Sequence, residues 1–121
     1  LLWLNLGRTK ITDEGIKTIG QLTNLMTLNL EYTETGDKGL ESLLSLKKLT
    51  SLNLVGTKSG DEGLTRLAQL SELKKIFLYQ TNVTVQGVTD VVAKLPGLSI
   101  DTGHYEMPTL VTDTLVFKGK R

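Results

Sequence analysis

A repeat of 24 residues constrains the fold of this chain more than any other feature. Cutting the sequence before four leucines gives segments that align without gaps, and the fourth is one residue longer: 1–24, 25–48, 49–72 and 73–97. Positions 1, 4, 6, 11, 16, 19 and 22 hold an aliphatic side chain in 25 of 28 cases, and the exceptions are Thr35, Ser59 and Lys94. A chain that is 39% hydrophobic would fill about 11 of these positions by chance, so the repeat is genuine.

The spacing of the aliphatic positions changes within each segment. Positions 4 and 6 are two residues apart, as on the buried face of a β-strand, whereas positions 16, 19 and 22 are three apart, as on one face of a short helix. One strand and one helix leave an apolar edge that a single unit cannot bury, and stacking the units buries that edge. The sequence therefore predicts an α/β solenoid of four strand–loop–helix units whose strands form one parallel sheet.

The shared pattern LxxLxLxxTxxTDxGLxxLxxL resembles leucine-rich-repeat proteins. It is most similar to the subtype with T-D-x-G-L after the strand, which occurs in F-box-associated repeats and in many bacterial repeat proteins. The resemblance covers residues 1–97 and implies a right-handed β–α horseshoe, with the parallel sheet on the concave face and the helices on the convex face. It also implies a surface that binds varied partners. The chain departs from the cysteine-containing subtype by having threonine in place of cysteine.

That threonine recurs directly after each predicted strand, at Thr9, Thr33, Thr57 and Thr81. Equivalent positions of a solenoid stack about 4.8 Å apart, so such residues form a row. We expect the hydroxyls of the threonine row to bond the amides and carbonyls of the turning backbone, because turning backbone must find partners. A row of hydroxyls that binds a ligand is the alternative.

An aspartate row stands before each of the first three predicted helices and ends at Val85 in the fourth unit: Asp13, Asp37 and Asp61. Helix capping is the favoured interpretation, because a carboxylate there accepts backbone N–H bonds and suits the positive end of the helix. A cation site built from stacked carboxylates is the alternative. A glycine follows two residues later in every unit, and we expect it to let the helix start pack closely against the neighbouring loop: Gly15, Gly39, Gly63 and Gly87.

The composition excludes several functional classes. With 14 basic and 13 acidic residues, the net charge of +1 gives no electrostatic reason to expect nucleic acid as a partner. No apolar run approaches the ~20 residues that span a bilayer, so we expect no membrane insertion. The chain has no cysteine and one histidine, His104, near Asp101 and Glu106. We interpret that histidine as incidental and predict no catalytic residue, no metal site and no cofactor.

The outward positions of the predicted strands favour protein binding. Positions 2, 3, 5, 7 and 8 of the four units are 20 of 121 residues, yet they hold four of the six aromatics, where chance would place about one. The predicted partner-binding residues on the concave face are Trp3, Arg8, Tyr32, Lys75, Phe77 and Tyr79. The alternative is that the aromatics near the two ends cover exposed core. Four strands span only about 19 Å, which is small for a standard interface, so we expect a longer array.

The function predicted from these features is a non-catalytic protein–protein interaction module, part of a longer repeat protein. The alternatives are a structural spacer and a substrate-selecting appendage of an enzyme domain. Residues 98–121 are expected to form a truncated last strand and a capping tail, with the repeat stopping at Asp101, where an apolar core residue is needed. The chain begins without methionine, so we expect residues upstream of Leu1. Leu4 and Leu6 would then lie on an uncapped first strand, where self-association is possible.

Overall fold

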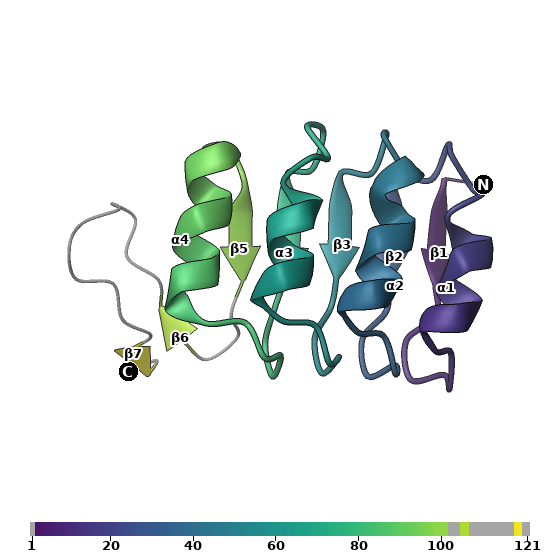
Figure 1. Ribbon diagram of the computed structural model, residues 1–121, viewed down its shortest axis with the longest axis horizontal. Helices are drawn as coiled ribbons and strands as arrows, with labels where there is room; N and C mark the ends of the chain where they lie inside the picture. Colours follow the sequence, from purple (N-terminus) through teal and green to yellow (C-terminus); the bar gives the residue numbers. More distant parts are fainter. Residues whose placement is uncertain (1, 102–104, 107–117, 120–121) are drawn as a thin grey trace.

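The computed structural model describes residues 2–101, 105–106 and 118–119. Strands and helices alternate along the first hundred residues, as Figure 1 shows. The strands are β1 (Trp3–Asn5), β2 (Thr27–Asn29), β3 (Ser51–Asn53), β4 (Lys75–Phe77) and β5 (Ser99–Asp101). The helices are α1 (Asp13–Ile19), α2 (Asp37–Ser42), the 3-10 turn η1 (Leu43–Ser45), α3 (Asp61–Leu67) and α4 (Val85–Lys94). A separate pair, β6 (Tyr105–Glu106) and β7 (Lys118–Gly119), is antiparallel.

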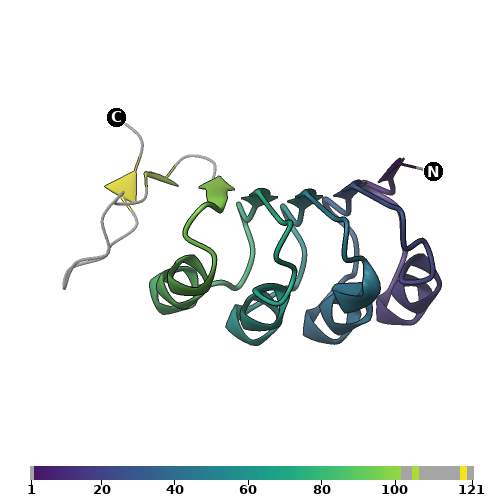
Figure 2. The ribbon, with the colours of Figure 1, turned by 90° about the horizontal axis from the view of Figure 1, so that it is seen from above.

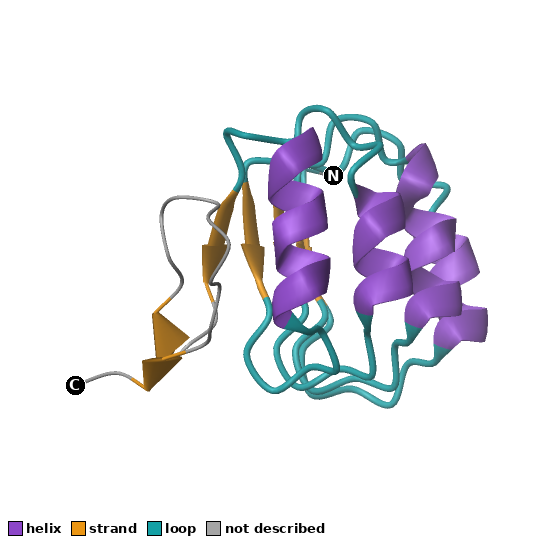
Figure 3. Cartoon of the chain, turned by 60° about the vertical axis from the view of Figure 1, so that its left-hand side comes forward, coloured by secondary structure: helices purple, strands orange, loops and turns teal. Residues whose placement is uncertain are grey.

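The first five strands form one parallel sheet in the order β1-β2-β3-β4-β5. Every strand pairs with the next at an offset of 24 residues, so the pairs Leu4–Leu28, Leu28–Leu52 and Leu52–Ile76 lie side by side. In the described part of the chain, the helices lie on one face of the sheet and none lies over the other face (Figures 2 and 3). Helices need more lateral room than strands, which makes the open sheet face the concave one. The predicted α/β leucine-rich solenoid is confirmed.

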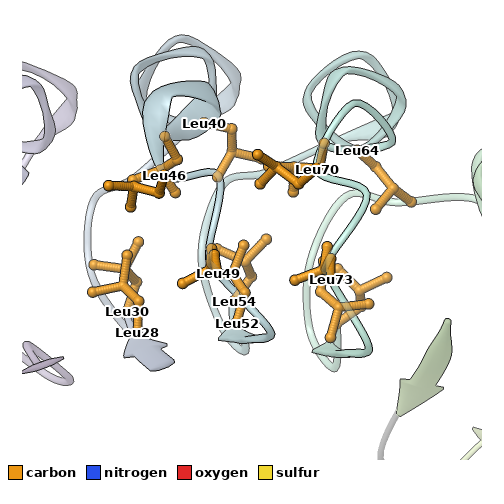
Figure 4. Packing of buried hydrophobic residues seen from close by; sticks show 14 of the residues in the cluster. Leu28, Leu30, Leu40, Leu46, Leu49, Leu52, Leu54, Leu64, Leu70 and Leu73 are labelled. Atoms are coloured by element: carbon orange, nitrogen blue, oxygen red, sulfur yellow. The ribbon is translucent and has the colours of Figure 1, made fainter. Parts of the chain in front are cut away.

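The core lies between the sheet and the helices and extends from Ile16 in the first unit to Leu98 before β5. Figure 4 shows its middle part. Inward residues of the strands and apolar residues of the helices from the second and third units have no exposed surface: Leu28, Leu30, Leu40, Leu43, Leu46, Leu52, Leu54, Leu67 and Leu70. Truncating one such leucine to alanine typically costs ~2–5 kcal/mol, so each row contributes strongly to stability. The aliphatic repeat in the sequence is this continuous core.

Two of the three polar side chains at aliphatic positions are buried and satisfied. The hydroxyl of Thr35 lies 2.8 Å from that of Thr33, and the hydroxyl of Ser59 lies 2.9 Å from that of Thr57. Thr35 and Ser59 have no exposed surface. Since an unsatisfied buried hydroxyl costs about 1–3 kcal/mol, these pairs explain how two polar residues are tolerated in the core.

The fourth unit absorbs its extra residue at the end of α4. Lys94 at position 22 is exposed, and the next residue, Leu95, packs against the core in its place. The next strand returns to the 24-residue register, since Ile100 pairs with Ile76 and Asp101 pairs with Phe77. The prediction that Asp101 occupies a core position is therefore wrong. Ile100 fills that position, and Asp101 is exposed at an outward one.

The two ends of the stack differ. At the first unit Leu4, Leu6 and Ile19 are only half-buried, and Leu2 is 60% exposed. At the fourth unit Val91 is buried completely. The predicted capping segment lies mostly outside the described residues, as do His104 and the hydrophobic residues between 107 and 117. The role of the segment 98–121 beyond β5 therefore stays a prediction.

Candidate interaction surface

The concave face of the sheet presents two rows of outward side chains. Along the first row lie Trp3, Thr27, Ser51, Lys75 and Ser99, and along the second lie Asn5, Asn29, Asn53, Phe77 and Asp101. The centre of the face is therefore small and polar, and its aromatic side chains stand towards the ends. Trp3, on β1, is 65% exposed and is the only tryptophan of the chain. The predicted aromatic surface is divided by this polar centre.

The asparagines of the second row hold the ends of their own strands. The side-chain oxygen of Asn5 accepts the backbone N–H of Gly7 at 2.9 Å, and that of Asn53 accepts the N–H of Val55 at the same distance. Asn29 bonds the Glu31 N–H in the same way, and its amide nitrogen donates to the Glu31 carboxylate at 3.0 Å. An amide that bonds its own backbone two residues on forms a tight local turn. These asparagines shape the rim of the face, and the sequence reasoning assigned them no role.

A turn with a left-handed residue follows each of the strands β1–β4. Position 8 has a positive φ in all four units: 63° at Arg8, 54° at Tyr32, 71° at Gly56 and 58° at Gln80. A side chain in this region costs energy that glycine does not, so Gly56 is the unstrained member of the row. The turn places the position-8 residues along one rim of the concave face, with side chains at Arg8, Tyr32 and Gln80.

Tyr32 links the members of this rim. The Arg8 guanidinium lies 4.6 Å from the centre of the Tyr32 ring, and the Tyr32 hydroxyl donates to the Gln80 side-chain oxygen at 2.7 Å. The ring passes over Gly56, where a Cβ atom would lie 2.4 Å from the nearest ring carbon. Arg8 also approaches the Glu31 carboxylate at 3.9 Å. The ring is thus held in place, although 39% of Tyr32 stays exposed.

The other predicted partner-binding residues lie at the opposite end of the sheet. The Lys75 ammonium is 4.8 Å from the centre of the Phe77 ring, and both belong to β4. Phe77 and Tyr79 are half-buried. The structure therefore does not bring all six residues together. Arg8 contacts Tyr32 and Lys75 contacts Phe77, while Trp3 lies on β1 and Tyr79 follows β4. The structure adds Gln80 to the candidate surface, because its side chain accepts the hydrogen bond of the Tyr32 hydroxyl two units away.

The threonine row bonds the backbone, as the favoured interpretation predicted. The hydroxyls of Thr9, Thr33, Thr57 and Thr81 donate to the carbonyl three residues earlier at 2.7–2.8 Å. These carbonyls belong to the leucine that directly follows each of β1–β4, where the chain turns away from the sheet. The row fixes that turn.

The aspartate row has a different partner from the one predicted. Each aspartate is the first residue of its helix, and no side chain caps α1, α2 or α3. The carboxylate of Asp13 instead accepts the N–H of Gly36 in the next unit at 2.7 Å, and Asp37 accepts the N–H of Gly60 at 2.7 Å. Asp61 likewise accepts the N–H of Thr84 at 2.7 Å and the hydroxyl of the same residue. The predicted place in the first helical turn is confirmed, but the N–H groups that the carboxylates accept belong to the next unit and not to their own helix, so the row joins successive units.

The glycine row makes room for these carboxylates. A Cβ atom on Gly39 would lie 2.6 Å from an Asp13 oxygen, and one on Gly63 would lie 2.6 Å from an Asp37 oxygen. A Cβ atom on Gly87 would lie 2.1 Å from an Asp61 carboxylate oxygen. Gly-to-Asp contact thus explains why the motif pairs the two residue types. The close packing predicted for the glycines is confirmed at Gly39, Gly63 and Gly87, where the neighbour is the aspartate of the preceding unit.

Ion pairs on the surface also cross between units. Lys58 and Glu34 lie 2.8 Å apart, and the hydrogen bond and charge of Lys58 lower the pKa of Glu34 while those of Glu34 raise the pKa of Lys58. Arg66 on α3 contacts Glu41 on α2 and lies 3.0 Å from Glu62 of its own helix. Exposed pairs of this kind contribute little to stability. They cover the loops and helices and leave the concave face open.

The part of the chain that the structure describes contains neither a candidate metal site nor a candidate membrane-spanning helix. Within that part, no three histidine, cysteine, aspartate or glutamate side chains are grouped so that they could hold a metal ion. None of the helices described there has the length and apolarity needed to cross a membrane.

The stacked units, the open parallel sheet and the bonded turns define a solenoid of the β–α type. A family model described as leucine-rich repeat matches residues 1–20, 21–44 and 45–68, which is more than half of the chain. This protein belongs to the leucine-rich-repeat family. Comparison with curated protein sequences gave no match.

Solved bacterial structures resemble the chain. A leucine-rich-repeat protein of Leptospira interrogans is similar over 84% of this chain, with a TM-score of 0.64 and 27% identity. An internalin of Listeria monocytogenes is similar over 84% of this chain, with a TM-score of 0.55 and 21% identity, and supports the fold alone. The matches cover 25% and 34% of those two chains, so this chain spans a quarter to a third of their length.

Proposed function

We propose that this chain is a non-catalytic protein-binding segment of a longer leucine-rich-repeat protein, and that the concave face and its rim hold the partner. Leucine-rich repeats generally mediate protein–protein interaction, which supports the class of function. The observation that carries the proposal is the contrast between the two faces. The helices occupy one face, while the other is an open sheet that carries a 65% exposed tryptophan and an arginine–tyrosine stack.

The chemistry of the rim suits a protein partner. Tryptophan, tyrosine and arginine are the residues that most often dominate binding energy in protein interfaces. Tyr32 is already fixed by Arg8 and Gln80, so binding through its exposed face costs little side-chain entropy. The polar centre of the sheet offers hydrogen-bond donors and acceptors between the aromatic groups. The concave face therefore combines anchors with polar contacts.

A longer array fits both the size of this face and the similar structures. Five strands at about 4.8 Å give a face only about 24 Å long, which is short for a stable interface. The similar Leptospira chain is four times as long as the part that this chain matches. We further propose the T-D-x-G-L subtype, because the inter-unit contact of Asp37 with Gly63 gives that motif a structural role.

The proposal is tested by affinity capture from the source organism with matched variants. The test variant is Trp3→Ala with Tyr32→Ala on the concave face, and the control is Lys17→Ala with Lys38→Ala on the convex helices. A protein retained by the wild type and the control but lost with the test variant is then purified and titrated. We expect its Kd to rise at least ~10-fold for the test variant, the usual effect of removing an aromatic anchor.

Two results would decide against this function. Equal recovery of all partners by both variants would show that the concave face does not bind them, and loss only with the convex control would move the site to the helices. If the chain is a structural spacer, no captured protein should be lost with either the concave or the convex variant. An enzyme appendage would be recognised if the captured protein binds the concave face only together with its substrate.

A further inference from the structure

The side chains at the start of the strands change in chemical character along the stack. In the first and second units they include Trp3 and Met26, which are large, apolar and exposed. In the fourth unit they are Lys74 and Lys75, which are cationic and exposed. Small hydroxyl side chains lie between these two ends. We call this set the strand-start row: Trp3, Met26, Thr27, Ser51, Lys74 and Lys75.

The register of the sheet makes the members of the strand-start row neighbours. Trp3 pairs with Thr27, Thr27 pairs with Ser51, and Ser51 pairs with Lys75. Three strand spacings therefore separate Trp3 from Lys75, which corresponds to about 14 Å across the concave face. The row is a short stripe with an apolar end on β1 and β2 and a cationic end on β4.

The apolar end is an accessible anchor point. Trp3 lies on a strand that is paired along its length with β2, so the backbone that carries the indole is fixed. Met26 directly precedes Thr27, the residue that pairs with Trp3, and therefore lies beside it. A tryptophan supplies much contact area at small entropic cost, and a flexible thioether adapts to the shape of its neighbour. This end suits a large apolar side chain of a partner.

The cationic end has no internal counter-charge. The ammonium of Lys75 lies 4.8 Å from the centre of the Phe77 ring, which orients it over β4. Neither Lys74 nor Lys75 forms an ion pair within the part of the chain that the structure describes. Two adjacent ammonium groups without a carboxylate complement a negative charge on a partner.

The hydroxyls in the middle of the row are free for a partner. Those of Thr27 and Ser51 make no hydrogen bond to any described residue. The next row outward on the sheet differs, because the side chains of Asn5 and Asn53 are already bonded to the turns of their own strands. A hydroxyl both donates and accepts, so the middle of the strand-start row suits the backbone of a segment that crosses it.

We propose that the strand-start row binds an extended segment of the partner in which an apolar and an acidic side chain lie four residues apart. In an extended chain residues i and i+4 face the same side and lie about 13 Å apart, which matches the ~14 Å between β1 and β4. The apolar side chain packs on Trp3 and Met26, and the carboxylate lies beside Lys74 and Lys75.

This inference rests on the proposed function, because it names the chemistry of the segment that the concave face holds. Its test uses synthetic peptides and no captured protein, so the two ideas fail separately. A captured partner that depends on Trp3, together with peptides that do not bind, would leave the proposed function and remove this inference. Capture that recovers no such partner would leave the peptide result as it stands.

The full chain is titrated with a capped nine-residue peptide of serine and threonine that carries one phenylalanine and, four residues later, one glutamate. Trp3 is the only tryptophan, so its fluorescence reports contact at the apolar end directly. We expect the emission to move to shorter wavelength as the indole leaves water, with a Kd below about 1 mM. Replacing the glutamate by glutamine, or moving it to the second residue after the phenylalanine, should raise the Kd at least about threefold at low salt.

Variants of the chain locate the charge contact. Lys74→Ala with Lys75→Ala should raise the Kd of the glutamate peptide at least about threefold and leave that of the glutamine peptide unchanged. The matched control is Lys38→Ala with Lys94→Ala, which removes the same charge from exposed positions on α2 and α4. The control should change neither Kd, which separates direct contact from an effect of net charge.

Three results would overturn the inference. The first is tryptophan emission that does not move with the glutamate peptide up to about 1 mM. The second is an equal Kd for the glutamate peptide, the glutamine peptide and the peptide with the shifted glutamate. The third is an equal effect of the two double variants on the glutamate peptide, because the lysines of the row would then have no special part in binding.

Discussion

Replacing Asp37 by alanine should destabilise the whole stack, because this carboxylate joins the second unit to the third. It accepts the N–H of Gly60 at 2.7 Å in a partly buried place. A hydrogen bond to a charged group contributes about 1.5–3 kcal/mol, and an acidic residue in the first helical turn adds about 0.3–1 kcal/mol. We therefore expect the free energy of unfolding to fall by about 2–4 kcal/mol in urea denaturation at neutral pH.

Glu62 provides the matched control for Asp37→Ala. It is also an acidic residue in the first turn of a helix, but its carboxylate is exposed and pairs with Arg66 on the surface. Glu62→Ala should cost no more than about 1 kcal/mol. Asp37→Asn should fall between the two, because the amide oxygen still accepts the bond without the charge. Equal losses for Asp37→Ala and Glu62→Ala would refute the inter-unit role of the aspartate row.

Three further predictions concern the glycine row, the core and the surface. Gly63→Ala should lower the free energy of unfolding by about 1–3 kcal/mol, because its Cβ would lie 2.6 Å from a carboxylate oxygen. The control Gly97→Ala has nothing within 4 Å of the added Cβ and should change the free energy of unfolding by less than about 1 kcal/mol. Similar losses for the two variants would contradict the close contact at Gly63. Leu52→Ala, at a side chain with no exposed surface, should cost about 2–5 kcal/mol in the same assay, and a loss below about 1 kcal/mol would contradict its place in the core. The Glu34–Lys58 pair stabilises the fold above the ordinary pKa of 4.5 of a glutamate, because Lys58 lowers the pKa of Glu34, and this contribution is lost as the pH falls through the lowered value. Glu34→Gln should therefore make the urea midpoint less dependent on pH in that acidic range at low salt, and an unchanged pH profile would show that the pair does not contribute.

The strands, the helices and the core can be predicted from the sequence, because each depends on residues that recur at fixed spacing. The 24-residue repeat places Leu28, Leu52 and Ile76 at equivalent positions, and they pair in register. The last strand was misplaced by one residue, because Ile100 follows a longer helix and the chain regains the register only after Leu98. A shift of that kind depends on how the stack constrains the strand, which a repeat alignment does not contain.

The contacts between units were harder to predict from the sequence. Asp37 and Gly63 are 26 positions apart, and their contact follows only from the lateral spacing of the helix starts. The link between Tyr32 and Gln80 spans two units and depends on the left-handed turn at position 8. Aromatic composition therefore indicated a binding face, while the grouping of its side chains required three-dimensional geometry.

Chemical-shift mapping on the isotopically labelled chain, with the purified partner from the capture experiment, tests the central claim most directly. If the concave face is the binding surface, backbone shifts should change at the outward positions of β1–β4 and at the rim residues Arg8, Tyr32 and Gln80, while the outer surfaces of α1–α4 stay unchanged. Shifts that change on the helices and not on the strands would contradict the account.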